Sequence, residues 1–296
     1  MEIERLTLAE WGDALPASGY EVFHDPAALE VLDEHTDAEL QLYGAYNGQQ
    51  PVGLLPVFVG DRAIGQTVLS PPASCSVPRL GPILTPASPK RHKRERINRQ
   101  LTDAVIDTVG VTDRTTLFRM SCPIEYADPR PYEWNGFSLE PRFTYVVDVD
   151  DETIESLMGG FSKSLRREMR KADDLDISID TEGIDSALRV YDDVVAQYRA
   201  HDDPAPISRS FLRDLLSALD DQQWRVYVAR TPDGAYQSGI VTLYAPDLAY
   251  FWQGGVTASY EGISVNSLLH RAILEDLIDD PQLASVTGYD LVGANT

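Results

Sequence analysis

The chain has 296 residues, 43% of them hydrophobic, which is ordinary for a globular protein and sufficient for two domains. Its formal net charge is −22, because 47 acidic residues face only 25 basic ones, and just four of the basic residues are lysines. This acidity excludes DNA binding as an expected function, since phosphate contacts need extended basic surface. No apolar run approaches the ~20 residues of a membrane-spanning helix, so we expect no membrane span.

The net charge predicts the salt concentration in which the protein works, and the first residues predict its cellular location. Self-repulsion destabilises such an acidic fold at low salt, and multimolar salt screens it, which predicts a halophilic protein. A well-solvated acidic protein is the alternative. The opening residues, MEIERLTLAEW, are acidic and unlike a secretion signal, so we expect a cytoplasmic protein. Cys75 and Cys122 lack metal-ligand spacing and no His/Cys pair is clustered, so no metal is expected.

The first part of the chain, residues 1–142, is predicted to form one domain. Its apolar patterns predict helices at 6–14, 26–33 and 91–109, and strands at 39–47, 52–59, 62–69 and 115–120. Residues 70–89 are rich in Pro and Ser, which predicts a mostly irregular connection.

The second part, residues 143–296, repeats the order of elements. Helices are predicted at 153–159, 162–172, 185–199, 208–219 and from 265 onward, and strands at 143–149, 177–179, 224–230, 237–244, 248–255 and 284–292. Both parts contain a strand hairpin, a third strand, a helix and a final strand, which favours one fold used twice. The expected fold class is α/β (α+β), with two tandem lobes, each a mixed, largely antiparallel sheet flanked by helices.

Two short windows concentrate the positive charge. Residues 90–99 and 163–171 hold 11 of the 25 cationic residues, including all four lysines. The second window lies on the predicted helix 162–172, where helical spacing gives a cationic face suited to carboxylates or phosphates. This face is formed by Lys163, Arg166, Arg167 and Arg170. The alternative is that both windows are solvated helices that balance neighbouring acids.

A polar elbow, Tyr260–Asn266, leads into the helix that begins near Val265. A helix N-terminus between two strands of one sheet is a ready anion site, because its free N–H groups and dipole favour negative charge. The elbow therefore suggests a ligand with phosphate groups, such as an acyl-CoA.

The motifs in their order resemble those of the Fem-type and BioF2-like acyltransferases, which carry two GNAT-like (Gcn5-related N-acetyltransferase) lobes. The resemblance rests on the strand 143–149 followed by the basic helix, on the strand 249–255 that ends in two glycines, and on the final stretch Tyr289–Gly293. Two features depart from the pattern. The pyrophosphate loop typical of GNAT proteins is absent, and the chain stops where family members usually continue.

The resemblance also implies site residues. Donor contacts are expected from the end of the third strand and from the elbow, at Gly254, Gly255, Val256, Gly262, Ser264 and Asn266. Trp252 is expected to contact substrate. Asp290, in an otherwise apolar strand, is the expected catalytic base, and Tyr260 is a candidate to protonate a leaving thiolate. The alternatives are that Gly262 and Ser264 only cap the helix and that Asp290 is structural. His270 is expected to lie at the surface or to serve helix packing.

The expected function is an acyltransferase that moves an acyl group from acetyl-CoA or another acyl-CoA to an amine of a small molecule or cell-envelope precursor. Two alternatives stay open. One is a Fem-type aminoacyl transferase that uses aminoacyl-tRNA, which the acidic composition disfavours. The other is a GNAT-like binding protein without turnover. The sequence does not indicate the acceptor or the oligomeric state.

Overall fold

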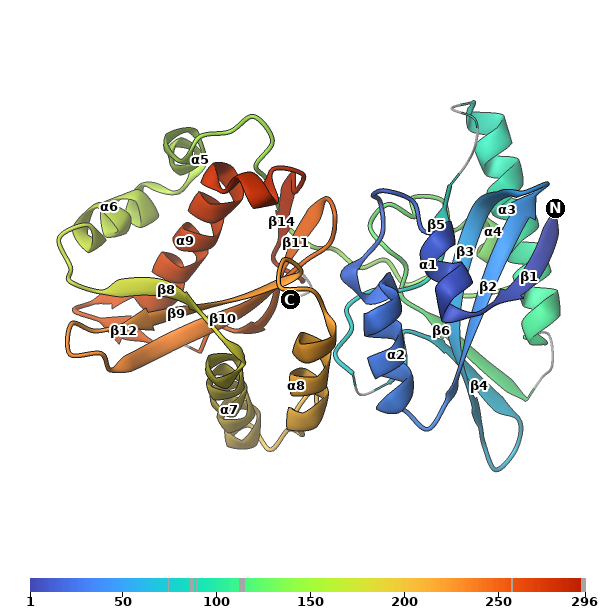
Figure 1. The fold of residues 1–296 in the computed structure, drawn as a ribbon, viewed down its shortest axis with the longest axis horizontal. Helices are drawn as coiled ribbons and strands as arrows, with labels where there is room; N and C mark the ends of the chain where they lie inside the picture. Colours follow the sequence, from blue (N-terminus) through green and yellow to red (C-terminus); the bar gives the residue numbers. More distant parts are fainter. Residues whose placement is uncertain (74, 86–87, 89, 112–114, 257, 294–296) are drawn as a thin grey trace. The chain divides into compact units, whose positions relative to one another are not determined.

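The computed structural model describes residues 1–73, 75–85, 88, 90–111, 115–256 and 258–293, and the chain divides into two compact units (Figure 1). The first unit is Met1–Pro141 and the second is Arg142–Thr296. Each unit is a mixed sheet flanked by helices, so the expected fold class is confirmed.

The first unit places helices on both faces of its sheet. Its helices are α1 (Leu8–Ala14), α2 (Pro26–Glu34), α3 (Arg91–Val109) and α4 (Arg130–Trp134), with a 3₁₀ turn at Val22–His24. Its strands are β1 (Glu2–Leu6), β2 (Glu39–Asn47), β3 (Gln50–Asp61), β4 (Gln66–Ser70), β5 (Ile83–Leu84) and β6 (Thr116–Met120). The order in the sheet is β1-β2-β3-β4-β6, with β5 on β3, and only β4 and β6 pair in parallel.

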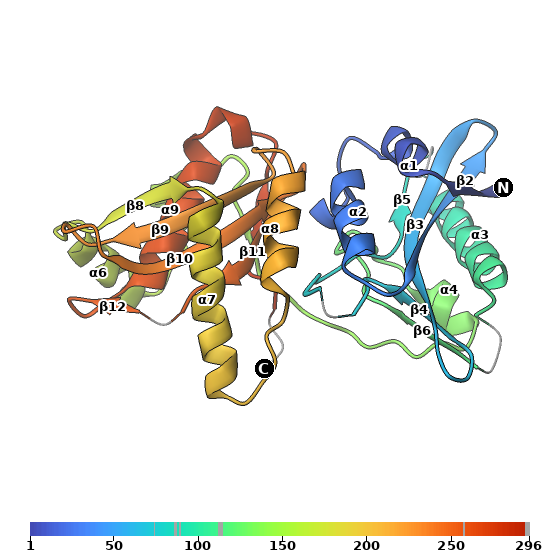
Figure 2. The same cartoon turned by 60° about the horizontal axis from the view of Figure 1, so that its bottom comes forward.

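The second unit has the same architecture with additions at its start. Its helices are α5 (Ile154–Gly160), α6 (Lys163–Ala172), α7 (Ile184–Ala200), α8 (Arg209–Ala218) and α9 (Val265–Asp279), with a 3₁₀ turn at Pro281–Leu283. Its strands are β7 (Val146–Asp148), β8 (Ser178–Glu182), β9 (Trp224–Arg230), β10 (Tyr236–Tyr244), β11 (Leu248–Gly254) and β14 (Gly288–Asp290), in the order β7-β14-β11-β10-β9-β8. A separate hairpin joins β12 (Ser259–Tyr260) and β13 (Ile263–Ser264). Helix α9 covers one face of the sheet, and α7 and α8 cover the other (Figure 2).

The two units share one topology. Strands β1, β2, β3, β4 and β6 correspond in order, direction and pairing to β8, β9, β10, β11 and β14. Helix α3 stands between the last two strands of the first unit, as α9 does in the second. The internal repeat suggested by the sequence is therefore present in the fold.

Local sequence explains why several helices begin where they do. Ser162, Ser208 and Ser264 each accept a hydrogen bond from a backbone N–H in the first turn of α6, α8 and α9. These side chains satisfy donors that a helix leaves unpaired at its N-terminus. The N-caps at Ser162 and Ser208 agree with the sequence pattern.

The structure differs from the sequence-based elements at several places, which include the unpredicted β5 and α4. The first strand, β1, was not predicted, because it is a short edge strand rich in charged residues. The predicted strands 143–149 and 284–292 shrink to three residues each, β7 and β14. The predicted elbow contains the β12–β13 hairpin, whose two-residue strands are too short to give an alternating pattern.

Candidate active site

The second sheet opens between β11 and β14. These strands pair in parallel only from Leu248 to Tyr250 and from Gly288 to Asp290, although β11 continues beside β10 to Gly254. A register shift in β10, between Val241 and Thr242, lies opposite the point where β11 leaves β14. Such bulges bend a strand and are common near active sites. We name this opening the fork, with arms 251–254 and 291–293.

Asp290 holds the β14 arm of the fork. Its side chain is fully buried, and its Oδ1 accepts hydrogen bonds from the Thr144 hydroxyl and from the Val292 backbone N–H, the latter at 2.8 Å. The Thr144 hydroxyl oxygen in turn accepts a bond from Gly293 N at 3.1 Å. Asp290 therefore fixes the turn that follows β14, and its expected role as base stays a prediction.

Four of the expected donor contacts form one cluster at the end of the β11 arm. Gly254 and Gly255 have positive φ angles of 120° and 75°. The Asn266 side chain, from the first turn of α9, donates to the Gly255 carbonyl at 2.6 Å and accepts from Ser238 Oγ at 3.2 Å. Ser238 Oγ also lies 3.3 Å from the Val256 carbonyl oxygen. Asn266 thus fastens the loop that leaves β11 to the start of α9.

The other expected elbow residues lie on the β12–β13 hairpin. Tyr260 is paired with Ile263, is half-buried, and packs against the core under α9. Gly262 has φ of 79° at the turn, with open space where a side chain would lie. Ser264 is the N-cap of α9, with its Oγ 3.4 Å from Ser267 N. The hairpin therefore separates Tyr260 and Gly262 from the two arms of the fork.

The N-terminus of α9 is already bonded within the protein. The Ser264 backbone N–H donates to Glu168 Oε1 of α6 at 2.7 Å, and Val265 N–H donates to the Ala258 carbonyl at 3.1 Å. Together with the Ser264 cap, these contacts occupy much of the anion site that a helix start would offer.

The expected cationic face is present on α6. Met169 and Ala172 are buried against Ile263 and Leu268, which leaves Lys163, Arg167, Arg170 and Lys171 exposed on the opposite side of the helix. Arg166 is half-buried and donates to the Gly159 carbonyl at 2.6 Å. Among the described residues, none of these five cations forms an ion pair.

Trp252 lies apart from these cations. Its side chain is 7% exposed and packs on Phe211 of α8, with ring centroids 6.5 Å apart. The alternation of β11 places Phe251 on the α9 face and Trp252 on the α8 face. The structure therefore places Trp252 in a packing position between β11 and α8.

One polar pair beside the fork was not expected from the sequence. His270 Nδ1 lies 3.0 Å from the Tyr289 hydroxyl, and the His270 ring packs edge-on against Phe251 at 5.1 Å. Burial lowers the pKa of His270 to about 4, and it raises the pKa of Tyr289 well above its usual value. The imidazole is therefore neutral near pH 7. The sequence left open whether His270 lies at the surface or packs with its helix; its partner, 19 residues away, depends on the sheet.

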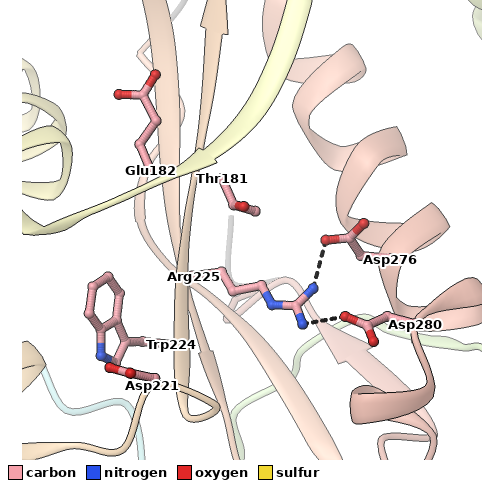
Figure 3. A pocket seen from close by; sticks show the side chains of 7 residues that line it. All are labelled: Thr181, Glu182, Asp221, Trp224, Arg225, Asp276 and Asp280. Atoms are coloured by element: carbon pink, nitrogen blue, oxygen red, sulfur yellow. Dashed lines mark hydrogen bonds and ion pairs between the residues drawn. The ribbon is translucent and has the colours of Figure 1, made fainter.

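A pocket of about 510 Å³ lies at the other end of α9 (Figure 3). Its lining is Thr181, Glu182, Asp221, Trp224, Arg225, Asp276 and Asp280. Arg225 reaches between Asp276 and Asp280, with 2.8 Å from its Nη1 to Asp276 Oδ2, and the Tyr227 hydroxyl donates to the same oxygen at 2.8 Å. We call this group of Arg225, Asp276, Asp280 and Tyr227 the lock, because its ion pairs and hydrogen bond join β9 to the end of α9. The pocket contains none of the residues expected at the site.

The described part of the chain contains neither a candidate metal site nor a candidate membrane-spanning helix. Its residues include no group of three or more His, Cys, Asp or Glu side chains placed to hold a metal ion. None of its helices is both long enough and apolar enough to cross a membrane.

Comparisons with known proteins support the GNAT-like fold of the second unit. The sequence profile of the family described as "Acetyltransferase (GNAT) domain" matches residues 159–296. This match lies within the second unit, whose residues from 159 onward are similar to a GNAT domain. A search of curated protein sequences found no significant match.

Solved structures extend the likeness to both units. A structure of FemX has a TM-score of 0.70 at 10% identity, covering 100% of this chain and 89% of FemX. The C-terminal domain of a putative lysylphosphatidylglycerol synthetase from Agrobacterium fabrum has a TM-score of 0.54 at 12% identity, covering 98% and 80%. L-PGS from Bacillus licheniformis has a TM-score of 0.51 at 12% identity, covering 97% and 77%. These values establish a shared fold. The expected resemblance to Fem-type proteins is thus confirmed at the level of the fold, and residues 159–296 also match the GNAT acetyltransferase family.

Proposed function

We propose that the protein is an N-acyltransferase that moves an acyl group from an activated donor to an amine of a small molecule or cell-envelope precursor. The fork carries this proposal, because among the described residues β11 has no paired strand on its β14 side beyond Tyr250, where a GNAT domain has an open sheet. We assign the reaction to residues 143–296 and regard residues 1–142 as the second GNAT-like lobe. We further propose a cytoplasmic location and a salt-rich setting.

The chemistry needs few protein groups. The amine nitrogen attacks the donor carbonyl, a C–N bond forms, and the C–S or C–O bond of the donor breaks. The proton lost by the amine passes to a base, and the leaving group takes up a proton. Binding in a fixed orientation supplies much of the rate, and polar groups stabilise the negative oxygen that develops. We propose Asp290 as base and Tyr260 as acid.

Acyl-CoA is the first donor that we propose, with Gly254, Gly255, Val256, Gly262, Ser264 and Asn266 as its contacts. We propose that Lys163, Arg166, Arg167 and Arg170 bind an anionic group of one substrate. Trp252 stays a proposed substrate contact, although its side chain packs against α8.

Aminoacyl-tRNA is the second candidate donor, and one observation favours it. The start of α9 is occupied by Glu168, whereas Lys163, Arg167, Arg170 and Lys171 of α6 are exposed and form no ion pair within the described residues. The structural neighbour from Agrobacterium fabrum is named a putative lysylphosphatidylglycerol synthetase, and this name denotes the joining of a lysyl group to another molecule. The net charge of −22 opposes tRNA binding away from α6.

The test is a transfer assay in multimolar KCl, with radiolabelled acetyl-CoA or aminoacyl-tRNA and a panel of amine acceptors. We expect label to pass to an amine with one donor class, and Asp290→Asn to reduce kcat by about 100-fold or more at an unchanged KM. A folded protein that transfers label from neither donor would instead support a GNAT-like binding protein. The double variant Arg167→Ala, Arg170→Ala should keep its thermal stability and lose about tenfold in donor or acceptor affinity.

A further inference from the structure

Glu168 lies between the basic face of α6 and the start of α9. Helix α6 packs on the hairpin and on α9 through Met169 and Ala172, and Glu168 is half-buried at the edge of this contact. Its Oε1 accepts the hydrogen bond from the Ser264 backbone N–H at 2.7 Å. Ser264 is the N-cap of α9, so the carboxylate sits at the positive end of that helix.

A carboxylate in this position competes with any phosphate. A helix N-terminus attracts anions through its N–H groups and its dipole. Here one negative charge is already present and bonded to a terminal N–H. A pyrophosphate at the same place would lose that donor and would lie beside a like charge, which is strongly unfavourable at short distance.

The same helix offers positive charge elsewhere. Lys163, Arg167, Arg170 and Lys171 are exposed on the side of α6 that faces away from α9. The contact through Glu168 therefore divides α6 into an acidic edge on α9 and a cationic face toward solvent. In a chain with net charge −22, an unpaired cationic face is a favourable place for a ligand phosphate.

We propose that Glu168 is a specificity-determining residue, which keeps the pyrophosphate of CoA away from α9 and leaves phosphate recognition to the cationic face of α6. This inference rests on the proposed acyltransferase function and weighs against the first of its two proposed donors, acyl-CoA, whose phosphates would have to share the start of α9 with Glu168. It predicts weak CoA binding by the natural protein and a preference for a donor or acceptor whose phosphates reach α6.

The experiment is calorimetric binding of CoA and of pantetheine, which lacks the phosphates, to the full chain in multimolar KCl. Glu168→Gln removes the charge and keeps the size of the side chain, while Glu168→Ala also frees the Ser264 N–H. We expect both variants to bind CoA about tenfold more tightly than the natural protein, with no change for pantetheine. Glu155→Gln, which removes one exposed charge from the neighbouring helix α5, is the matched control and should change neither affinity.

The binding results do not depend on catalysis, because CoA and pantetheine are measured without an acceptor amine. Equal CoA affinity in the natural protein and both variants, or absence of CoA binding in all three, would overturn the role of Glu168. A loss of thermal stability without a gain in CoA affinity would show that Glu168 only docks α6 on α9, which also overturns it. Failure of the transfer assay with every donor would reject the acyltransferase and leave this binding result unaffected.

Discussion

The two units repeat one topology, and they differ where the last two of the five shared strands meet. In the first unit, β4 and β6 pair along their whole length, Gln66–Ser70 with Thr116–Met120. In the second, β11 and β14 pair over three residues and then form the fork. Strand β5 explains part of the difference. In the first unit, β5 pairs with β3 at Gly53–Leu54. At the corresponding part of β10 in the second unit, the partner is still β11.

In the first unit, the ends of β4 and β6 are held together, and we call this feature the closure. The buried side chain of Ser70 stabilises it. Ser70 Oγ donates to the Pro56 carbonyl at 2.7 Å and accepts from Gly81 N at 2.9 Å. Its backbone carbonyl accepts from Ser121 N, and Ser121 in turn accepts from Leu80 N. The segment around Leu80–Gly81 thus crosses the end of β4 and β6. The same strand order therefore gives a closed or an open sheet, depending on which connection crosses its end.

The largest expected effect comes from a side chain placed on the β11 arm. In Gly254→Ala, the added Cβ would lie 2.3 Å from the Gly239 carbonyl oxygen, at a φ of 120° that L-residues rarely adopt. We expect a loss of about 4 kcal/mol in unfolding free energy, from the steric clash and the backbone strain together. Denaturant unfolding measures it. Gly262→Ala also has positive φ but open space, so it should cost only about 1 kcal/mol; equal losses would contradict the close packing of the arm.

The second prediction concerns the lock at the far end of α9. Arg225→Ala leaves Asp276 and Asp280 without their shared cation, and we expect about 3 kcal/mol less stability for the second unit. The first unit has an exposed ion pair, Arg5 with Glu39, and Arg5→Ala should change stability by less than about 0.5 kcal/mol. Thermal unfolding of both variants tests the contrast, and similar shifts in Tm would refute it.

The third prediction uses one buried histidine in each unit. Burial lowers the pKa of His24 and of His270 from 6.5 to about 4. Each is neutral in the folded protein, while the unfolded chain takes up a proton below pH 6.5. Stability is therefore fully present above about pH 6.5 and is lost as the pH falls toward 4, by up to about 3 kcal/mol per histidine.

Amide hydrogen exchange, followed separately for the two units between pH 7 and pH 4, measures this loss of unfolding free energy. His24 is fully buried and its Nε2 lies 3.1 Å from the Gly81 carbonyl oxygen, whereas His270 is partly exposed, so the first unit should respond more. His270→Gln should remove its share of the acid sensitivity of the second unit only. An unchanged pH profile in that variant would contradict the assignment; His92→Gln, on the exposed side of α3, is the control.

The smallest expected effect is on the closure of the first unit. Ser70→Ala removes two buried hydrogen bonds, leaves the Pro56 carbonyl and the Gly81 N–H unsatisfied, and should cost about 2 kcal/mol. Amide exchange should rise around residues 80–84 and stay constant in the second unit. Ser121→Ala loses one bond at a half-buried position and should cost less. A larger effect of Ser121→Ala would show that Ser70 does not hold the closure.

Elements with strong local signals could be predicted from the amino-acid sequence alone. Strands β2 and β9 and helix α3 have the bounds that their apolar patterns predict, and Ser162 and Ser208 cap the helices expected after them. The concentration of cations on α6 was also visible, because helical periodicity fixes which residues share a face. The order of elements gave the repeat and the resemblance to Fem-type acyltransferases.

The contacts between these elements could not be predicted from local sequence, because they form only when the chain packs into its fold. The fork depends on where pairing between β11 and β14 stops, and the contacts of Glu168 with Ser264 and of His270 with Tyr289 join residues 96 and 19 positions apart. Asn266 and Trp252 likewise acquire their partners through packing. Local propensity and periodicity act over a few residues, whereas these contacts depend on strand register and helix docking, which are set by burial of the whole core.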